Sequence, residues 1–347
     1  MFDLPSFDDH EGVHFFHDAA SGLRCVIAIH STVLGPSAGG TRMWNYATGA
    51  EMVTDVLRLS QGMSYKNAMA GLELGGGKAV IWGNSKTDKS EAMFRAFGRA
   101  VESLQGRYWT AEDVGIDTAD IDIAAQETKY AAGTTNGGAA SGDPSPITAF
   151  GVFRGIKASA MRAFGSDDLS GRTVAVQGVG SVGGHVCRHL AEAGAKLVVC
   201  DVDEAALAVV SQRDGAIIVP INEIYDAEAD IFSPNALGAI INRDTLKRLK
   251  VKVIAGGANN QLKTPEMGAL VRDAGILYAP DYVINGAGII NVAAEISGTY
   301  SRAWVDGKTD VLIDTLGQVL DEALAAGDAT NVVADRIARA RIEAGRG

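Results

Sequence analysis

The chain has 347 residues, of which 47% are hydrophobic and 21% are charged, as in an ordinary globular protein. This length exceeds what one hydrophobic core normally supports, so we expect two domains. With 31 basic and 42 acidic residues the net charge is −11, which argues against nucleic acid or an anionic membrane as the main partner.

The cysteines and the N-terminus give no sign of an exported or metal-binding protein. Cys25, Cys187 and Cys200 are odd in number and lack CxxC spacing, so we expect buried thiols in a reducing compartment and neither a disulfide framework nor a zinc site. The first residues have no charged stretch followed by an apolar one, and no run of about 18 apolar residues occurs later. We therefore expect a cytoplasmic protein without a bound metal.

The first part of the chain alternates strands and helices. Residues 23–30 and 78–82 are apolar runs of strand length, and residues 49–70 between them have apolar side chains at helical spacing. A second helix is predicted over residues 88–104, followed by a short strand over residues 108–110. This order indicates an α/β domain.

A loop rich in glycine, threonine and asparagine occupies residues 133–144 and breaks both periodicities. We place the domain boundary there, with a first domain over residues 1–134 and a second over residues 135–327. A helix with proline in its first turn is predicted from residue 145 to about residue 164, and we expect it to bridge the two domains. The final helical segment, within residues 328–347, is expected to fold back on the first domain.

The second domain contains short apolar runs separated by helical or turn segments. This spacing is typical of a doubly wound parallel sheet, the Rossmann architecture. The runs cover residues 172–177, 195–201, 217–219, 231–233, 253–255 and 276–278, and two helices over 310–326 and 332–344 follow them.

A glycine fingerprint joins the first two of these runs. The strand is followed by Gly178-Val179-Gly180-Ser181-Val182-Gly183, which opens a helix that ends near Gly194. In such a turn the first glycine makes the bend, the second lets backbone N–H groups approach a pyrophosphate, and the third lets the helix pack on the sheet. The helix N-terminus adds partial positive charge, so the context predicts a bound dinucleotide. The alternative is a glycine-rich turn in an α/β protein that binds no nucleotide.

An acidic residue follows the second strand of this motif. Asp201 lies 23 residues after Gly178, where its carboxylate can accept hydrogen bonds from the adenosine ribose. A 2′-phosphate would meet Asp201, Asp203 and Glu204 with no nearby arginine, so NAD is preferred over NADP. His185 and His189 on the intervening helix lack a third metal ligand and are expected to be ordinary helix residues.

Two lysines stand out in the first domain because their surroundings are glycine-rich and apolar. Lys78 closes the run Gly75-Gly76-Gly77-Lys78, and Lys66 lies twelve residues upstream, near the end of a predicted helix. Two ammonium groups held close together repel each other and are poorly hydrated, which favours a neutral form of at least one of them. A neutral lysine is a base, although a glycine turn with a solvated lysine is the alternative interpretation.

Taken with the fingerprint, these features make the chain resemble the glutamate/leucine/phenylalanine/valine dehydrogenase family along nearly its whole length. The family is one of NAD-linked amino-acid dehydrogenases, with an active site in the cleft between an N-terminal α/β substrate and oligomerisation domain and a Rossmann domain. The resemblance implies reversible deamination of an L-amino acid to a 2-oxo acid and ammonia by a homo-oligomer. The matching segments, besides the fingerprint, are residues 35–42, 63–67, 75–78, 110–115, 258–260 and 280–285.

The resemblance also implies roles for individual residues. Lys66 binds the substrate carboxylate, Lys78 activates water for attack on the imino intermediate, and Asp113 exchanges a proton with the substrate amine and with ammonia. The backbone at Gly39 and Gly40 approaches the substrate. Thr148 contacts the nicotinamide carboxamide, and we assign Asn260 to the substrate and Asn259 and Asn285 to the cofactor, while leaving open which of the three contacts which.

The substrate side chain is predicted from a few positions. Where glutamate-specific members hold the γ-carboxylate with a lysine and a serine, this chain has Ala38 and Val292, so that carboxylate would be desolvated and unpaired at a cost of several kcal/mol. An apolar pocket is expected instead, lined by Ala38, Met63, Ala111, Ile289 and Val292. Leucine-type members match best and we favour branched-chain substrates. Ala38 also leaves room for a ring, so phenylalanine stays open, because one methylene changes binding by only about 1–3 kcal/mol.

Two other functions compete with this interpretation. A hydroxy-acid dehydrogenase would use a histidine–carboxylate pair, and the six histidines lie away from the lysines and Asp113 in the sequence. A non-catalytic NAD-binding regulator would have no need of Lys66, Lys78 and Asp113 together.

Overall fold

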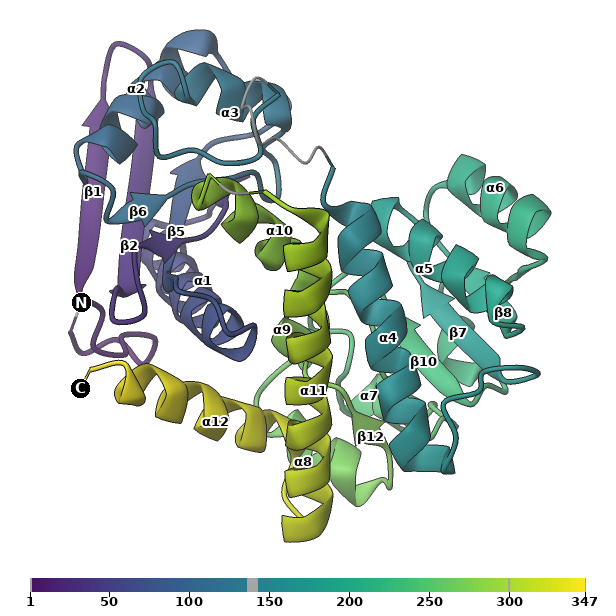
Figure 1. Ribbon diagram of the computed structural model, residues 1–347. Helices are drawn as coiled ribbons and strands as arrows, with labels where there is room; N and C mark the ends of the chain where they lie inside the picture. The colour runs from purple at the N-terminus through teal and green to yellow at the C-terminus, as the bar shows by residue number, and fades with distance from the viewer. Residues whose placement is uncertain (1, 136–142, 299, 347) are drawn as a thin grey trace. The chain divides into compact units, whose positions relative to one another are not determined.

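The computed structural model of the protein describes residues 2–135, 143–298 and 300–346. The chain forms two compact units (Figure 1). The first unit combines Met1–Asp143, Ile289–Val305 and Ala338–Gly347, and the second combines Pro144–Gly288 and Asp306–Ile337. Much of the predicted loop over residues 133–144 lies outside the described residues, so the boundary between residues 134 and 135 stays a prediction.

The first unit is built on a mixed six-stranded sheet in the order β1-β2-β5-β3-β6, with β4 also paired to β5. β1, β2 and β5 are antiparallel neighbours, whereas β3, β4 and β6 join the sheet in parallel pairs. The strands are β1 (Gly12–Asp18), β2 (Leu23–Ser31), β3 (Ser37–Ala38), β4 (Thr41–Trp44), β5 (Gly75–Trp82) and β6 (Tyr108–Trp109).

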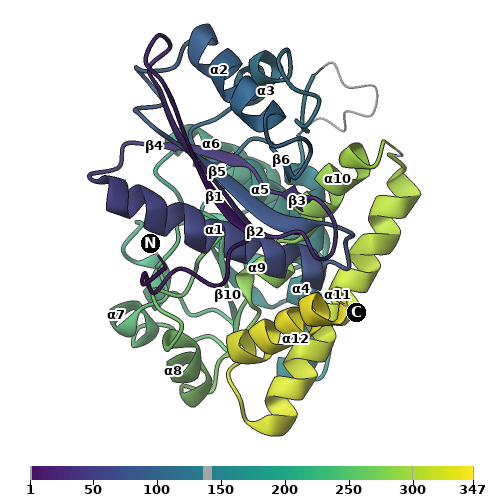
Figure 2. The ribbon, with the colours of Figure 1, turned by 90° about the vertical axis from the view of Figure 1, so that its left-hand side faces the viewer.

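Helices cover both faces of this sheet (Figures 1 and 2). On one face Val56 and Leu57 of α1 (Gly49–Met69) pack with Val80 of β5. On the other face α2 (Glu91–Glu102) and α3 (Thr118–Ala124) bury their apolar sides against Ile81. Side chains alternate along a strand, so Lys78 points to the same face as Val80, the face that α1 covers.

The helices begin where polar side chains satisfy their free N–H groups. Thr48 accepts from Glu51 N ahead of α1, and Ser90 accepts from Met93 N ahead of α2. The predicted helices over residues 49–70 and 88–104 are therefore confirmed, the second with ends two or three residues shorter.

The glycine run before Lys78 is part of a strand. The sequence predicted a strand from residue 78, but β5 begins at Gly75, three residues earlier. A Cβ on Gly76 would lie 2.0 Å from Ser64 N of α1, and a Cβ on Gly77 would lie 2.7 Å from Ser37 Oγ. The glycines are required because α1 and β3 approach the backbone of β5 more closely than any side chain permits.

The second unit contains a parallel six-stranded sheet in the order β12-β11-β10-β7-β8-β9. Its strands are β7 (Thr173–Gln177), β8 (Lys196–Cys200), β9 (Ile217–Ile218), β10 (Ile231–Pro234), β11 (Val253–Ile254) and β12 (Leu277–Tyr278). From β9 the chain order reads 3-2-1-4-5-6, which is the Rossmann order. The predicted doubly wound sheet is confirmed, and each strand lies within the predicted run or within one residue of it.

From residue 144 onward the first helix is α4 (Ser145–Phe164), which confirms the helix predicted over residues 145–164. The predicted helix over residues 310–326 begins eight residues earlier, at Arg302. The helices are α5 (Ser181–Glu192), α6 (Glu204–Asp214), α7 (Arg243–Leu246), α8 (Met267–Asp273), α9 (Asp281–Ile284), α10 (Ala287–Ile296), α11 (Arg302–Ala326) and α12 (Thr330–Ala344).

The end of α12 belongs to the first unit. Arg341 donates from Nη1 to the carbonyl oxygens of Ala68 and Met69, at 3.1 Å each, where α1 ends. Both carbonyls belong to the last turn of α1, where Ala68 O also accepts from Gly71 N at 3.1 Å, so the arginine adds a side-chain donor at the C-terminus of the helix.

Within the described residues, none of the helices combines the length and apolar character needed to span a bilayer. The same residues contain no group of three or more histidine, cysteine or carboxylate side chains arranged around a metal position. Cys25, Cys187 and Cys200 are buried free thiols, as predicted.

Candidate active site

Lys78 and Asp113 form an ion pair at the core of the candidate site. Lys78 Nζ lies 2.8 Å from Asp113 Oδ2, and the two side chains are only 6% and 21% exposed. They come together because β4 binds the segment after β6 through its backbone: Thr41 N donates to Ala111 O and Met43 N to Val114 O. Lys78 on β5 and Asp113 in the loop after β6, which lie far apart in the sequence, are thereby held on either side of β4.

The carboxylate of this pair is held as an anion. Burial raises the pKa of Asp113, but the Lys78 ammonium and the Arg42 guanidinium outweigh it, so the pKa lies below its ordinary value. The sequence had suggested that a second lysine lies close to Lys78 and favours a neutral form of at least one of the two. The structure shows that a carboxylate contacts the Lys78 ammonium directly.

Lys66 lies in the last turn of α1 and is half-buried, as its predicted place near the helix end requires. The contact between Ser64 and Gly76 brings this turn of α1 onto β5 close to Lys78. The C-terminal end of a helix carries partial negative charge, which favours an ammonium group there. Its role in binding the substrate carboxylate stays a prediction.

Gly39 and Gly40 are needed for packing within the protein. A Cβ on Gly39 would lie 1.9 Å from Gly77 O, and a Cβ on Gly40 would lie 2.3 Å from Glu112 O and 3.0 Å from Asp113 Cβ. These glycines therefore let β5 and the Asp113 segment approach the β3–β4 connection. The approach of their backbone to a substrate stays a prediction.

The residues predicted to line an apolar pocket all belong to the first unit. Ala38 in β3 and Ala111 after β6 are buried, and Met63 of α1 would have its Cγ 3.0 Å from a Cβ on Gly39. Ile289 and Val292 lie on α10, and Glu295 of the same helix accepts from Gly133 N of the first unit at 2.7 Å. The structure thus brings them into one region, and their contact with a substrate stays a prediction.

The glycine fingerprint lies at the carboxyl end of β7, where the sheet order reverses between β8 and β10. Gly178 has φ +89°, and a Cβ there would lie 2.6 Å from Ala236 Cβ. A Cβ on Gly183 would lie 2.0 Å from Gly178 O, whereas nothing lies within 4 Å of a Cβ on Gly180. The outer glycines thus serve the turn and the packing, and Gly180 faces open space at an N-terminus of α5 that has no side-chain cap.

This contrast gives a matched pair of variants. Gly180→Ala should leave the melting temperature unchanged, because Gly180 has an ordinary negative φ of −67° and room for a methyl group. The same variant should weaken NAD binding at least tenfold, because the methyl group would occupy the approach of the pyrophosphate. Gly183→Ala should lower the melting temperature instead. Calorimetry of NAD binding and thermal unfolding check both, and unchanged affinity in Gly180→Ala would contradict the assignment.

Asp201 is brought to the fingerprint, as its spacing predicts. Its Oδ2 accepts from Val179 N at 2.6 Å and its Oδ1 from Asp203 N at 3.0 Å. Asp203 caps α6 by accepting from Ala205 N and Ala206 N. The carboxylate at residue 201 therefore lies at the turn, and its contact with a ribose stays a prediction.

The three asparagines lie after β11 and at the end of α9. Asn285 Nδ2 donates to Gly257 O at 3.1 Å and to Asn259 Oδ1 at 2.7 Å. Asn285 Oδ1 is buried and accepts no hydrogen bond from the described residues. Asn260 adopts a left-handed backbone conformation with φ +52°. Thr148, on α4, donates to Pro144 O at 3.0 Å and lies against Gly288.

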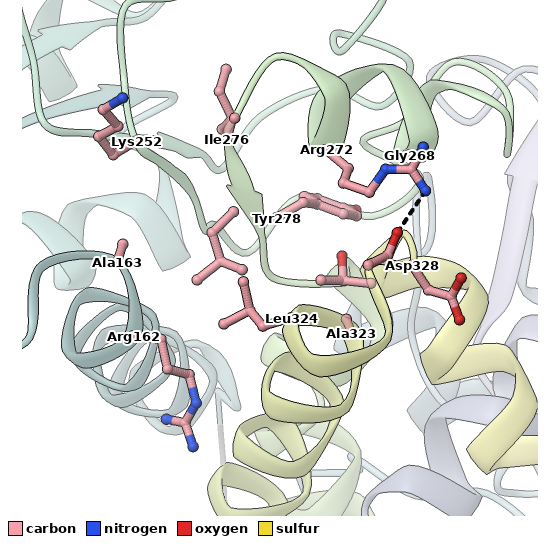
Figure 3. Close-up of a pocket in the computed structure, with 14 residues that line it drawn as sticks. Arg162, Ala163, Lys252, Gly268, Arg272, Ile276, Tyr278, Ala323, Leu324 and Asp328 are labelled. Carbon is pink, nitrogen blue, oxygen red and sulfur yellow. Dashed lines mark hydrogen bonds between the residues drawn. The ribbon is translucent and has the colours of Figure 1, made fainter.

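A separate cavity of about 340 Å³ lies at the amino ends of β11 and β12 in the second unit (Figure 3). Its arginines are engaged within the protein: Arg272 donates to Gly327 O after α11, and Arg162 donates to both carboxylate oxygens of Asp321 in α11. Ligands of doubly wound sheets bind at the carboxyl ends of the strands. The cavity contains none of the predicted site residues and lies at the opposite edge.

The sequence did not identify Arg42, Asp55 and Tyr46 as part of the site. Arg42 contacts both Asp113 and Asp55, and Tyr46 donates to Asp55. Arg42 is the last residue of segment 35–42, which carried part of the family resemblance, and this resemblance was the sign in the sequence that Arg42 could belong to the site. Its contact with Asp113 spans 71 residues, so no local pattern could reveal it.

Comparison with known proteins places this geometry in a family. Residues 10–130 match the dimerisation domain of Glu/Leu/Phe/Val dehydrogenases, and residues 137–215 and 202–333 match the Glutamate/Leucine/Phenylalanine/Valine dehydrogenase model. A leucine dehydrogenase of Geobacillus stearothermophilus is 54% identical over 335 residues, which cover 96% of this chain and 91% of that protein. A phenylalanine dehydrogenase of Bacillus thermotolerans is 45% identical, with 97% and 89% covered.

Solved structures agree with the sequence comparison. The L-tryptophan dehydrogenase of Nostoc punctiforme superposes with a TM-score of 0.84 at 42% identity and covers 97% of both chains. A glutamate dehydrogenase of Thermus thermophilus shares the fold at 19% identity, with a TM-score of 0.80 over 97% of this chain and 89% of that one. The predicted family and fold class are confirmed, and the chain belongs to the Glu/Leu/Phe/Val dehydrogenase family.

Proposed function

We propose that the protein is an NAD-dependent dehydrogenase that converts branched-chain L-amino acids reversibly to 2-oxo acids and ammonia. The observation that carries this proposal is the Lys78–Asp113 pair at 2.8 Å, in a chain that is 54% identical to a leucine dehydrogenase. Oxidation of an amine to an imine and hydrolysis of that imine both require proton transfer at fixed positions. A lysine and an aspartate in hydrogen-bond contact supply two such positions.

Each residue then has a chemical task. Lys66 binds the substrate carboxylate as a cation, and Asp113 accepts a proton from the substrate ammonium group. NAD, when bound, accepts the hydride from Cα. Lys78 in its neutral form takes a proton from the water that attacks the imino carbon, and the short contact with Asp113 lets protons pass between the two side chains.

The residues of the second unit fit a dinucleotide. Gly180 leaves open space beside uncapped N–H groups of α5, and Asp201 lies at the turn where ribose hydroxyls would donate to it. The buried Asn285 Oδ1 is a free acceptor suited to an amide N–H such as that of nicotinamide. Asp201, Asp203 and Glu204 disfavour a 2′-phosphate. Arg213 does reach Gly184 O, but its guanidinium is paired with Asp214.

Asp201→Ala is expected to raise the KM for NAD and to reduce the preference for NAD over NADP. The change removes the ribose acceptor and one negative charge, each of which favours NAD over its 2′-phosphate form. Glu192→Ala, an exposed carboxylate at the end of α5, serves as the control. Steady-state kinetics with both cofactors check this, and cofactor kinetics unchanged from the parent enzyme would remove the ribose assignment.

The substrate class follows from the apolar side chains on β3, α1 and α10. They offer no partner for a γ-carboxylate, so glutamate is disfavoured. The test is the initial rate of NADH formation with L-leucine, L-valine, L-isoleucine, L-phenylalanine, L-glutamate and a 2-hydroxy acid. We expect the highest kcat/KM for a branched-chain amino acid. Highest activity with phenylalanine would support the alternative that the small Ala38 leaves open, and activity with the hydroxy acid alone would refute the proposal.

We also propose that the enzyme is a cytoplasmic homo-oligomer. The match of residues 10–130 to a dimerisation domain supports assembly, and three buried thiols without a disulfide suit a reducing compartment. Light scattering coupled to size-exclusion chromatography measures the assembly directly, and a monomer at working concentration would contradict it.

A further inference from the structure

A continuous chain of polar side chains leads from the start of α1 to Lys78. Tyr46 Oη donates to Asp55 Oδ2 at 2.6 Å, and Arg42 Nη1 lies 3.2 Å from the same oxygen. On its other side Arg42 Nε lies 3.3 Å from Asp113 Oδ2, the atom that also contacts Lys78. Arg42 therefore bridges two carboxylates, one of which belongs to the candidate catalytic pair.

The backbone fixes Arg42 at this position. Its neighbours Thr41 and Met43 donate to the segment that contains Asp113, and Arg42 itself is paired with Val80 in the parallel β4–β5 ladder. Strand β4 therefore lies between the backbone that carries Asp113 and the strand that carries Lys78. An arginine in this place contacts Asp113 without requiring any movement of the main chain.

The charges alternate along the chain of side chains. Asp113 is shared by two cations, Lys78 and Arg42, and Asp55 supplies a second anion on the far side of Arg42. A guanidinium presents several N–H groups in a fixed plane and can bind two carboxylates at once, which an ammonium on a flexible stem does less well. Arg42 is 19% exposed, so its contacts are only partly screened by water.

We propose that Arg42 is a positioning residue for the reaction: it holds the Asp113 carboxylate as an oriented anion against Lys78, while Asp55 and Tyr46 fix the guanidinium from the other side. The inference rests on the proposed function, because it assigns to Arg42 the task of preparing Asp113 to accept a proton. Arg42 acts through Asp113 and needs no contact with the substrate.

The groups that face Asp113 determine the effect of removing Arg42. Lys78 faces Asp113 from β5 and Arg42 faces it from β4, Asp55 and Tyr46 lie beyond Arg42, and the buried Tyr108 of β6 lies on the sheet nearby. Removal of Arg42 leaves Asp113 with one cation instead of two. The pKa of Asp113 should then rise, because a close opposite charge that favours the carboxylate anion has been removed.

The experiment compares Arg42→Gln and Arg42→Lys with the parent enzyme in kcat/KM as a function of pH. We expect Arg42→Gln to lose at least tenfold in kcat near neutral pH and to shift the acidic limb upward, with a smaller change in substrate KM. Arg42→Lys retains the charge and should restore the position of the limb but only part of kcat. Arg24→Gln is the matched control, because Arg24 is exposed on the same sheet and stacks over Trp82.

Thermal unfolding and NAD binding establish that each variant is folded. An Arg42→Gln enzyme whose kcat and pH profile both overlay those of the parent would overturn the inference. So would equal losses in Arg42→Gln and Arg42→Lys with an unmoved acidic limb, since that pattern indicates a purely structural role. Full activity of Asp113→Asn would instead refute the proposed function, so the two failures are distinguishable.

Discussion

Replacement of Lys78 by alanine is expected to lower kcat on the order of 10²–10⁴-fold while NAD binding persists, because the variant loses the base that activates water. Lys78 belongs to the first unit and the glycine fingerprint to the second, so the cofactor turn is untouched. The fold should tolerate the change, since Asp113 keeps Arg42 as a cationic partner and is partly exposed. Stopped-flow or steady-state assays of NADH formation, with calorimetry of NAD binding, measure both quantities.

Lys86→Ala provides the control for this experiment, because Lys86 is an exposed lysine in the loop after β5. Its kcat should equal that of the parent enzyme. If Lys78→Ala retained turnover, or if it lost NAD binding instead, Lys78 would have a structural role and the proposed mechanism would be wrong.

Asp113→Asn is expected to lower kcat on the order of 10²–10⁴-fold as well, because an amide cannot accept the proton of the substrate ammonium group. The substitution also leaves Lys78 and Arg42 as two neighbouring cations without an anion between them. We therefore expect a lower melting temperature in addition to the loss of turnover. Glu73→Gln, at an exposed carboxylate in the loop before β5, should change neither quantity.

The stability effect of Asp113→Asn should depend on pH. The pKa of Asp113 in the folded protein lies below its ordinary value of 3.8, so the carboxylate stabilises the fold above that value and the contribution disappears as the pH falls through the folded-state pKa. Melting temperatures of the parent and the variant should thus differ near pH 7 and converge in strong acid. A difference independent of pH would show that the asparagine disturbs packing and not charge.

The sequence predicted best the features that depend on residues close together in the chain. The turn at Gly178, the helix after it and Asp201 lie within one strand–helix–strand unit, and each is found where its spacing places it. Lys66 at the end of α1 follows from helical periodicity in the same way. Such local patterns reflect hydrogen bonding and burial within one element, which a single sequence records.

Features created by distant segments could not be predicted. The start of β5 at Gly75 depends on the approach of α1 and β3 to its backbone, and the two-residue strand β3 exists through its pairing with β5 and β6. The sequence indicated that a second lysine lies near Lys78, which stays a prediction, and it did not reveal the contact of Lys78 with Asp113. The contact of Arg42 with Asp113 forms only in the folded sheet, where β4 lies between the backbone of Asp113 and β5.

The most direct test of the account is the stoichiometry of the reaction with L-leucine and NAD. Purified enzyme should release NADH, ammonia and the corresponding 2-oxo acid in a ratio of 1:1:1, and should consume all three in the reverse direction. Formation of NADH without ammonia, or no turnover with any L-amino acid, would contradict the proposal that Lys78 and Asp113 carry out an amino-acid deamination.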